Sequence, residues 1–245
     1  MCFAPDATPP PLPSGRPPLP GERIELTSAD GTRFAAYRVT PAEPNGRAVM
    51  VLPDIRGLFA FYENLAGAFA AEGFEAIAID YFGRTADDTD RGPDFDPWPH
   101  VERAETETVQ ADIAAAKAAL GEQPVYTVGF CFGGGHSFMC AASGEGFAGV
   151  VGFYGRPYSP NQWYPSAIEV TDRMTCPVLG LFGGADNSIP LDIVGEFDAV
   201  LGDSGVEHEI HVYDGAPHSF FDRSSEQWAD ACTDAWTRTL AFMRA

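Results

Sequence analysis

The chain has 245 residues and a formal net charge of −20, from 35 acidic and 15 basic side chains. This length is enough for one domain with a sizeable core. The composition, 45% hydrophobic and 20% charged, is typical of a globular protein. So acidic a chain repels phosphate backbones, which excludes nucleic acid as the main partner. No apolar run reaches the 18 or so residues needed to cross a bilayer, so no membrane association is expected.

The cysteines are five in number and widely spaced, without a C-x-x-C pair. They are Cys2, Cys131, Cys140, Cys176 and Cys232. This pattern argues against a disulfide framework or a zinc ribbon and favours a reducing, cytoplasmic location. The first 20 residues hold eight prolines and lack the apolar stretch of a secretory signal. We therefore expect an extended N-terminal arm over residues 1–21 and one folded domain over residues 22–245.

Strand patterns recur along the domain. Residues 24–26 and 33–39 read as two strands around the turn Ala29-Asp30-Gly31. Short continuous apolar runs, typical of strands buried on both faces, then follow at residues 48–52, 76–79, 125–130, 150–154 and 178–182. Residues 208–213 alternate instead, which predicts a strand at the sheet edge.

Helical patterns separate these strands. One apolar face recurs between Leu58 and Phe69, another between Val109 and Leu120, and a third from Trp228 to Met243. Strands that alternate with helices predict a mostly parallel, doubly wound α/β sheet flanked by helices. The Asp-, Gly- and Pro-rich stretch 85–99 reads as a long surface loop, a type that is often functional.

Residues 129–135, with the sequence GFCFGGG, carry the sharpest chemical signal. This segment follows a buried strand and opens a helix of small residues, the context of a nucleophile elbow with Cys131 in place of the usual serine. Glycines two residues before and after Cys131 leave room for a tight turn. The N–H of Phe132 begins the helix and could donate to an oxyanion, and the helix dipole favours a thiolate.

A cysteine nucleophile needs a base, and the base needs an orienting acid. Asp186 follows the strand at 178–182 in the sequence FGGAD, and His218 lies on a loop between the last strand and the last helix. This order, nucleophile, acid and histidine, is that of the α/β-hydrolase fold.

Other acids and histidines remain as alternatives. Asp192 and Asp203 are rival acids, although they fall inside or after the next helix pattern. His136, one helical turn from Cys131, is a rival base, although on that helix it should point into the packing. His100 reads as exposed, and His208 and His211 lie in the last strand.

The chain resembles the dienelactone hydrolase family from about Glu22 to Ala245. The motifs that carry the resemblance are GFCFGG at 129–134, GGAD at 183–186 and GAPHSF at 215–220. The family consists of α/β-hydrolases with a Cys-Asp-His triad, which implies Cys131 as nucleophile, Asp186 as orienting acid and His218 as base. It implies no metal and no organic cofactor.

The resemblance also implies three further roles and shows one departure. Asp54, in PDIRG at 53–57, stands where the family has a carboxylate that holds the resting thiol, and the N–H of Ile55 would be the second oxyanion donor. Arg84 matches a family arginine that binds the substrate carboxylate. The family has a second such arginine four residues after the histidine, where this chain has Asp222.

Each of these residues has a plainer interpretation. Asp54 could cap the next helix, and Arg84 could pair with the acidic loop on the surface. Several aromatic residues could wall an apolar substrate pocket or simply belong to the core; these are Tyr81, Phe82, Trp98, Phe132 and Trp163.

The sequence therefore predicts a hydrolase that cleaves a carboxylic ester or lactone through a cysteine nucleophile. A small-molecule ester or lactone would be its partner, and a monomer is favoured. The alternatives within the hydrolases are a thioesterase or a promiscuous carboxylesterase. The alternative from another class is a fold relative that binds a small ligand without turnover.

Overall fold

The computed structural model describes residues 8–86, 90–92, 94–159 and 164–245. These residues form an eight-stranded sheet in the order β1-β2-β4-β3-β5-β6-β7-β8. The strands are β1 Glu22–Thr27, β2 Arg33–Val39, β3 Ala48–Leu52, β4 Glu75–Ile79, β5 Val125–Phe130, β6 Gly149–Phe153, β7 Val178–Gly183 and β8 His208–Tyr213. From β4 to β8 all neighbouring strands are parallel, and β2 pairs antiparallel with β1 and β4. The predicted mostly parallel sheet is confirmed.

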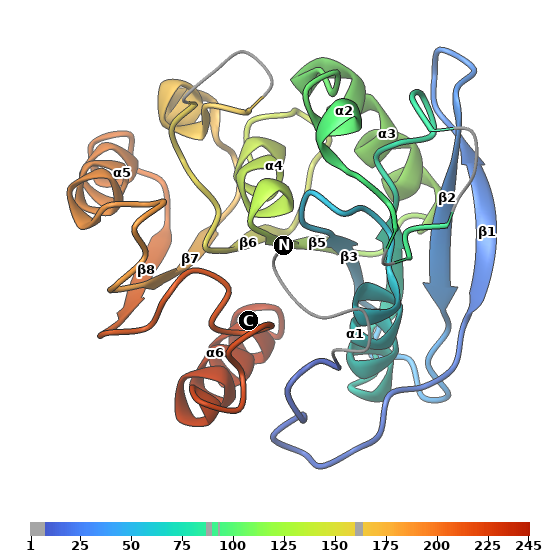
Figure 1. Ribbon diagram of the computed structural model, residues 1–245, viewed down its shortest axis with the longest axis horizontal. Coiled ribbons are helices and arrows are strands. Elements are labelled where there is room, and N and C mark those ends of the chain that lie inside the picture. The colour runs from blue at the N-terminus through green and yellow to red at the C-terminus, as the bar shows by residue number, and fades with distance from the viewer. Residues whose placement is uncertain (1–7, 87–89, 93, 160–163) are drawn as a thin grey trace.

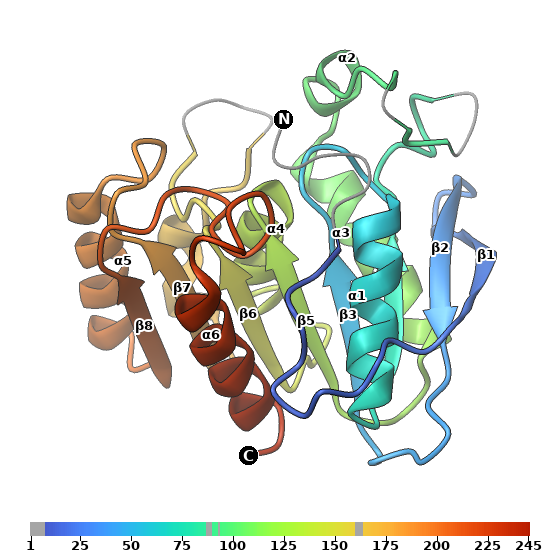
Figure 2. The ribbon, with the colours of Figure 1, turned by 60° about the horizontal axis from the view of Figure 1, so that its bottom comes forward.

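Helices cover both faces of this sheet. They are α1 Ala60–Ala71, α2 Trp98–Val101, α3 Thr106–Ala119, α4 Phe132–Cys140, α5 Leu191–Asp203 and α6 Ala229–Phe242, with a 3₁₀ helix at Ala167–Arg173. Helices α1 and α6 lie on one face, and α3, α4 and α5 lie on the other (Figures 1 and 2). The three helical patterns predicted from the sequence correspond to α1, α3 and α6.

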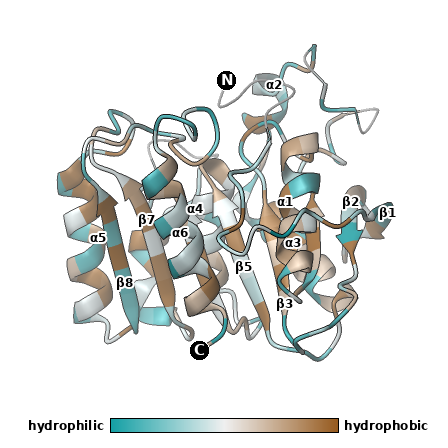
Figure 3. Cartoon of the chain, turned by 90° about the horizontal axis from the view of Figure 1, so that it is seen from below, coloured by the Kyte–Doolittle hydropathy of each residue, from teal (hydrophilic) through white to brown (hydrophobic). Residues whose placement is uncertain are grey.

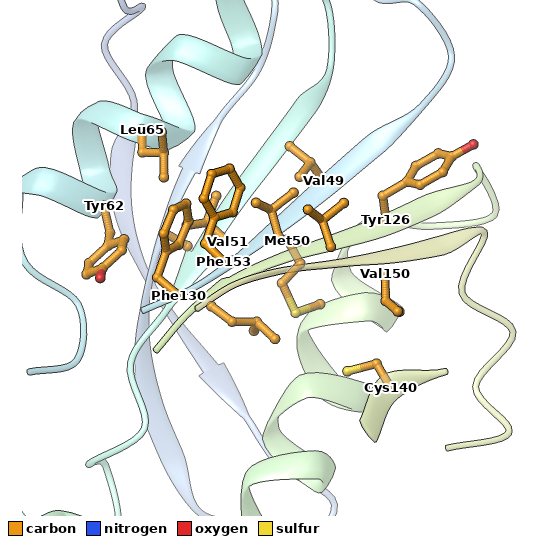
Figure 4. Packing of buried hydrophobic residues seen from close by; sticks show 14 of the residues in the cluster. Val49, Met50, Val51, Tyr62, Leu65, Tyr126, Phe130, Cys140, Val150 and Phe153 are labelled. Atoms are coloured by element: carbon orange, nitrogen blue, oxygen red, sulfur yellow. The ribbon is translucent and has the colours of Figure 1, made fainter. Parts of the chain in front are cut away.

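The apolar runs of the sequence form the strands at the centre of the hydrophobic core. Every residue of β3, β5, β6 and β7 is buried, because helices pack on both sides of these strands. Figure 4 shows Phe130 and Phe153 on the α1 side, near Tyr62, whereas Met50 and Val150 point to the α4 side. Strand β8 lies at the sheet edge, as its alternating pattern predicts, and carries hydrophilic bands beside the apolar β7 (Figure 3).

The Pro-rich arm packs on the domain over its described part. The side chain of Leu12 is buried in the core, and the indole Nε1 of Trp236 in α6 donates to the carbonyl of Pro10 at 3.0 Å. Further along, the N–H of Leu19 donates to the carbonyl of Gly67 in α1 at 3.0 Å. The arm therefore bridges α6 and α1, and Figure 2 shows it crossing between them.

A buried ion pair fixes the long loop that follows β4. Arg91, in this loop, forms a double hydrogen bond to Asp80, with Nη2–Oδ2 at 2.7 Å and Nε–Oδ1 at 3.1 Å. Both side chains are almost completely buried. Asp80 also accepts from the N–H groups of Leu58 and Phe82, at 3.0 and 3.1 Å. The Asp80 carboxylate thus joins the loop after β3 to the loop after β4 at the carboxyl edge of the sheet.

Candidate active site

The nucleophile elbow forms where β5 ends and α4 begins. Cys131 stands between them with φ +52° and ψ −111°, a left-handed conformation that is strained for a residue with a side chain. Its N–H donates to the carbonyl of Phe153 in β6, and its carbonyl accepts from the Tyr164 hydroxyl at 2.9 Å. These bonds hold the strained residue at the carboxyl edge of the sheet.

The two glycines of the elbow motif are needed for space. A Cβ on Gly129 would lie 2.0 Å from the carbonyl oxygen of Gly133, and a Cβ on Gly133 would lie 2.2 Å from the carbonyl oxygen of Leu52. No side chain can occupy such gaps without movement of the backbone. The spacing predicted from the sequence therefore has a direct steric cause.

Asp186 and His218 meet at the same edge of the sheet. Asp186 follows β7 and His218 follows β8, and His218 Nδ1 lies 2.6 Å from Asp186 Oδ2. The other carboxylate oxygen of Asp186 accepts from the N–H groups of Ser188 and Ile189, at 2.7 and 3.2 Å. These two bonds fix the carboxylate, so it can orient the imidazole with Nε2 directed away.

The pKa of His218 reflects the charges around it. Burial lowers this pKa, but the negative charge of Cys131 and the hydrogen bonds to Asp186 and Cys131 outweigh burial and raise the pKa to about 10. The imidazole therefore interacts with both its acid and the thiol. Such an arrangement favours a thiolate–imidazolium pair near neutral pH.

The loop after β3 brings Asp54 and Ile55 to this edge. Asp54 is completely buried, and its Oδ1 accepts from the N–H of Arg56 at 2.9 Å. It does not cap the next helix, because α1 begins only at Ala60. Phe132 is the first residue of α4, so its N–H is one of the four that have no acceptor within the helix.

The remaining predicted site residues are held by contacts with their neighbours. Arg84 pairs with Asp30 in the β1–β2 turn and with Asp112 in α3, the latter at 2.7 Å. Tyr81 and Phe82 are buried. The Tyr81 hydroxyl donates to the carbonyl of Pro53 at 2.9 Å, and its ring packs edge-on against Phe132.

The other aromatic candidates differ in position. Phe82 packs against Phe95 and His100, with ring centroids 5.8 and 5.6 Å away. Trp98 is half exposed in α2. Trp163 lies outside the described residues.

The alternative base, His136, and the alternative acids, Asp192 and Asp203, do not have the surroundings of His218 and Asp186. His136 is completely buried, as expected, and burial lowers the pKa of its imidazole to about 3. A histidine with so low a pKa is a poor general base at neutral pH. Asp192 and Asp203 are exposed residues at the two ends of α5.

The sequence analysis missed Tyr154, and it considered Asp222 only as the residue that stands in place of a second substrate-binding arginine. Tyr154 follows β6, has φ +37° and is fully buried; its ring centroid lies 5.0 Å from that of His218. Its hydroxyl donates to Asp222 Oδ2 at 2.7 Å. The available signal was that Tyr154 directly follows a buried strand, as Cys131 does.

Among the described residues, no group of three His, Cys, Asp or Glu side chains is placed to hold a metal ion. In that same part of the chain, no helix is long and apolar enough to cross a membrane.

The parallel sheet, the strained residue after β5 and the acid–histidine pair after β7 and β8 define an α/β-hydrolase. The model of the "Dienelactone hydrolase family" matches residues 34–245. The chain belongs to this family.

Individual relatives extend the comparison. The chain is 27% identical over 239 residues to the carboxymethylenebutenolidase of Rhodococcus opacus, covering 94% of each sequence. It is also similar to the crystal structure of a "Putative Dienelactone Hydrolase" from Klebsiella pneumoniae, with TM-score 0.78, 27% identity, and coverage of 92% of this chain and 99% of that one. An esterase from Pyrococcus furiosus, at 14% identity and TM-score 0.68, covers 91% of each chain and shares the fold.

Proposed function

We propose that this chain hydrolyses carboxylic esters or lactones with Cys131 as a covalent nucleophile, His218 as base and Asp186 as the orienting acid. The observation that carries the proposal is the position of the His218 imidazole. It lies 2.6 Å from the buried carboxylate of Asp186 and interacts with the thiol at the strained elbow. Membership of the dienelactone hydrolase family and the carboxymethylenebutenolidase relative support the same reaction class.

Acylation would begin from the thiolate–imidazolium pair. The Cys131 sulfur attacks the carbonyl carbon, and the N–H groups of Phe132 and Ile55 stabilise the oxyanion, a contribution of about 3 kcal/mol per donor. The carbon–oxygen bond to the leaving group then breaks. The imidazolium of His218 gives its proton to the departing alkoxide, which leaves an acyl thioester on Cys131.

Deacylation would use the same groups. The neutral imidazole of His218 takes a proton from water, and the resulting hydroxide attacks the thioester carbonyl. The carbon–sulfur bond breaks, the acid product leaves, and the thiolate–imidazolium pair is restored. Asp186 keeps the proton on Nδ1 throughout, so that Nε2 can exchange the reacting proton.

A pre-steady-state assay tests this proposal. Rapid mixing with a 4-nitrophenyl ester should give a burst of nitrophenolate of about one equivalent, because acylation by an activated ester is faster than thioester hydrolysis. Mass spectrometry of the quenched protein should find the acyl group on the peptide that contains Cys131. The Cys131→Ala variant serves as the control and should give neither burst nor acyl adduct.

Each other outcome has a distinct meaning. Turnover in Cys131→Ala equal to that of the wild type would refute the covalent role of this residue. Binding of the ester without release of alcohol would favour a ligand-binding protein. Faster turnover of acyl thioesters than of all oxygen esters would favour a thioesterase.

A further inference from the structure

The residue directly after the proposed base is held in a strained conformation. Ser219 has φ +61°, in the left-handed region, although it is not a glycine. It is 1% exposed, and within the described part of the chain its hydroxyl has no hydrogen-bond partner. Neither the residue type nor its own side chain favours this conformation, so the packing around the segment must maintain it.

Phe221 supplies much of that packing. It lies three residues after His218 and is fully buried. Its ring centroid is 4.7 Å from that of Phe153 and 5.8 Å from that of Phe130, the residue directly before Cys131. One side chain therefore contacts the strand that leads into the elbow and belongs to the segment that carries the base.

Trp236 in α6 packs against the other side of Phe221. Their ring centroids are 5.5 Å apart at 66°, and Trp236 also packs against Phe69 in α1 at 5.0 Å. The indole N–H donates to the carbonyl of Pro10 at 3.0 Å, and Leu12 is 5% exposed in the core. Without the arm this buried N–H would lose its acceptor, which favours a different ring position.

The surface of the domain is shaped to receive the arm. A Cβ on Gly67 in α1 would lie 2.3 Å from the carbonyl oxygen of Leu19, so only glycine allows the arm to lie so close to this helix. The Arg16 guanidinium donates to the carbonyl of Ala71 at the end of α1, at 2.9 Å. These contacts give the arm one defined path across α1 to α6 (Figure 2).

We propose that residues 10–12 of the arm position the proposed base, His218, relative to the thiol of Cys131. They do so by holding Trp236 against Phe221, which in turn keeps the strained segment after the base in place. This inference rests on the proposed hydrolase triad and goes beyond it, because it makes the arm a positioning element of the active site.

Loss of the arm should slow the chemical step more than it weakens substrate binding. A displacement of about 1 Å that originates far from the chemistry can cost about 100-fold in rate. Here α6 also holds the segment directly, since the Cys232 thiol donates to the carbonyl of Phe220 at 3.4 Å. The segment should therefore loosen rather than detach, and we expect kcat to fall by about tenfold while KM changes by less than about twofold.

Two shortened chains and two point variants test the proposal. One chain begins at Ser14 and lacks both Pro10 and Leu12, and the other begins at Thr8, keeps both and serves as the matched control. Leu12→Asn puts a polar group into a buried apolar site, whereas Leu12→Met keeps an apolar side chain of similar size. Circular dichroism establishes that each variant is folded.

Two readouts are compared. The first is kcat and KM for a neutral 4-nitrophenyl ester. The second needs no turnover: it is the rate at which iodoacetamide alkylates Cys131, followed by mass spectrometry of its peptide at pH 6.5 and at pH 9.5.

The ratio of these two alkylation rates reports the position of His218. At pH 6.5 the thiolate depends on the imidazolium beside it, whereas at pH 9.5 a thiol with an ordinary pKa is mostly ionised without help. A change in access to the thiol affects both rates and cancels in the ratio. The charged residues on the loops around this pair are the same in every variant; they are Asp54, Arg56, Asp186, Asp222 and Arg223.

The chain that begins at Ser14 and the Leu12→Asn variant should both lose about tenfold in kcat and about fivefold in the alkylation ratio. The chain that begins at Thr8 and Leu12→Met should stay within about twofold of the wild type. If the chain that begins at Ser14 does not fold, the comparison of Leu12→Asn with Leu12→Met decides the question.

Wild-type kcat and a wild-type ratio in a folded chain that begins at Ser14 would overturn this inference and leave the hydrolase proposal intact. An equal loss in the chain that begins at Thr8 would also overturn it, because residues 10–12 would not be the cause. A wild type that hydrolyses no ester overturns the hydrolase proposal, whereas the alkylation ratio still shows whether the arm positions His218.

Discussion

Replacing Asp186 with asparagine changes one atom of the side chain, yet the structure dictates how the new amide must orient. Asp186 Oδ1 accepts from two backbone N–H groups, at Ser188 and Ile189, and Oδ2 faces His218 Nδ1 at 2.6 Å. If the amide nitrogen took the Oδ1 position, it would oppose two donors. The amide oxygen should therefore stay with the two N–H groups, and the NH₂ group should face the imidazole.

This orientation forces the wrong tautomer on His218. An NH₂ group can only donate, so Nδ1 must become an acceptor and the ring proton must move to Nε2. The imidazole then cannot take the thiol proton through Nε2. A forced tautomer of this kind typically costs about 10⁴ in kcat for a serine nucleophile. We expect roughly 10³ to 10⁴ here, which is about 4 to 5.5 kcal/mol of transition-state stabilisation.

The assay is steady-state hydrolysis of a neutral 4-nitrophenyl ester by Asp186→Asn, with Asp192→Asn as the control. Asp192 is an exposed acid in the first turn of α5, so its variant should keep the wild-type rate. If Asp186→Asn stays within tenfold of the wild type, or if Asp192→Asn is the impaired variant, the assignment of the orienting acid is wrong.

Iodoacetamide should label Cys131 well before Cys140, because burial raises the pKa of the Cys140 thiol far above its usual value; equal labelling by mass spectrometry would contradict this. His218→Ala should lower kcat/KM for an aryl ester by several orders of magnitude, and His136→Ala should affect the rate much less; the reverse result would identify His136 as the base. Because the folded pKa of His218 is about 10, above an unfolded value of about 6.5, its protonation stabilises the fold fully below pH 6.5 and less as pH rises through 10. The melting temperature Tm should therefore fall as pH rises from 6.5 to about 10. The same fall in a Cys131→Ala variant would refute the view that the Cys131 thiolate raises the pKa of His218. Arg91→Met should lower the free energy of unfolding by about 3 to 5 kcal/mol in urea titrations, since it leaves a buried carboxylate unpaired; a loss below 1 kcal/mol would show that the pair is dispensable.

Much of the fold could be predicted because it depends on local patterns. The runs at 48–52 and 125–130 coincide with β3 and β5, and the Trp228–Met243 periodicity corresponds to α6. A short continuous run of apolar residues has to be buried on both faces, and a central strand between two layers of helices is one of the few structures that achieve this. The 3₁₀ helix at Ala167–Arg173 has no such pattern, because its shape depends on packing against α4 and α5 rather than on a periodic apolar face.

The candidate site was predictable only where position relative to a strand decides the role. Cys131, Asp186 and His218 each follow a buried or edge strand, and parallel strands bring their carboxyl ends to one edge. Arg84 also follows a strand, but its direction is decided by Asp30 and Asp112, which are distant in sequence. A long flexible side chain reaches whichever carboxylate the fold brings near, and local sequence does not encode that choice.

The bridge between the Pro-rich arm and α6 has a consequence for how the chain reaches its native state. The hydrogen bond from Trp236 to Pro10 joins residues 226 positions apart, and the buried Leu12 belongs to the same contact. During synthesis the arm leaves the ribosome well before α6, which carries its docking site. At roughly 5 to 20 residues per second, the arm must wait about 10 s or more for that helix. The proline segment thus stays undocked, and open to proteases and chaperones, until α6 has been synthesised.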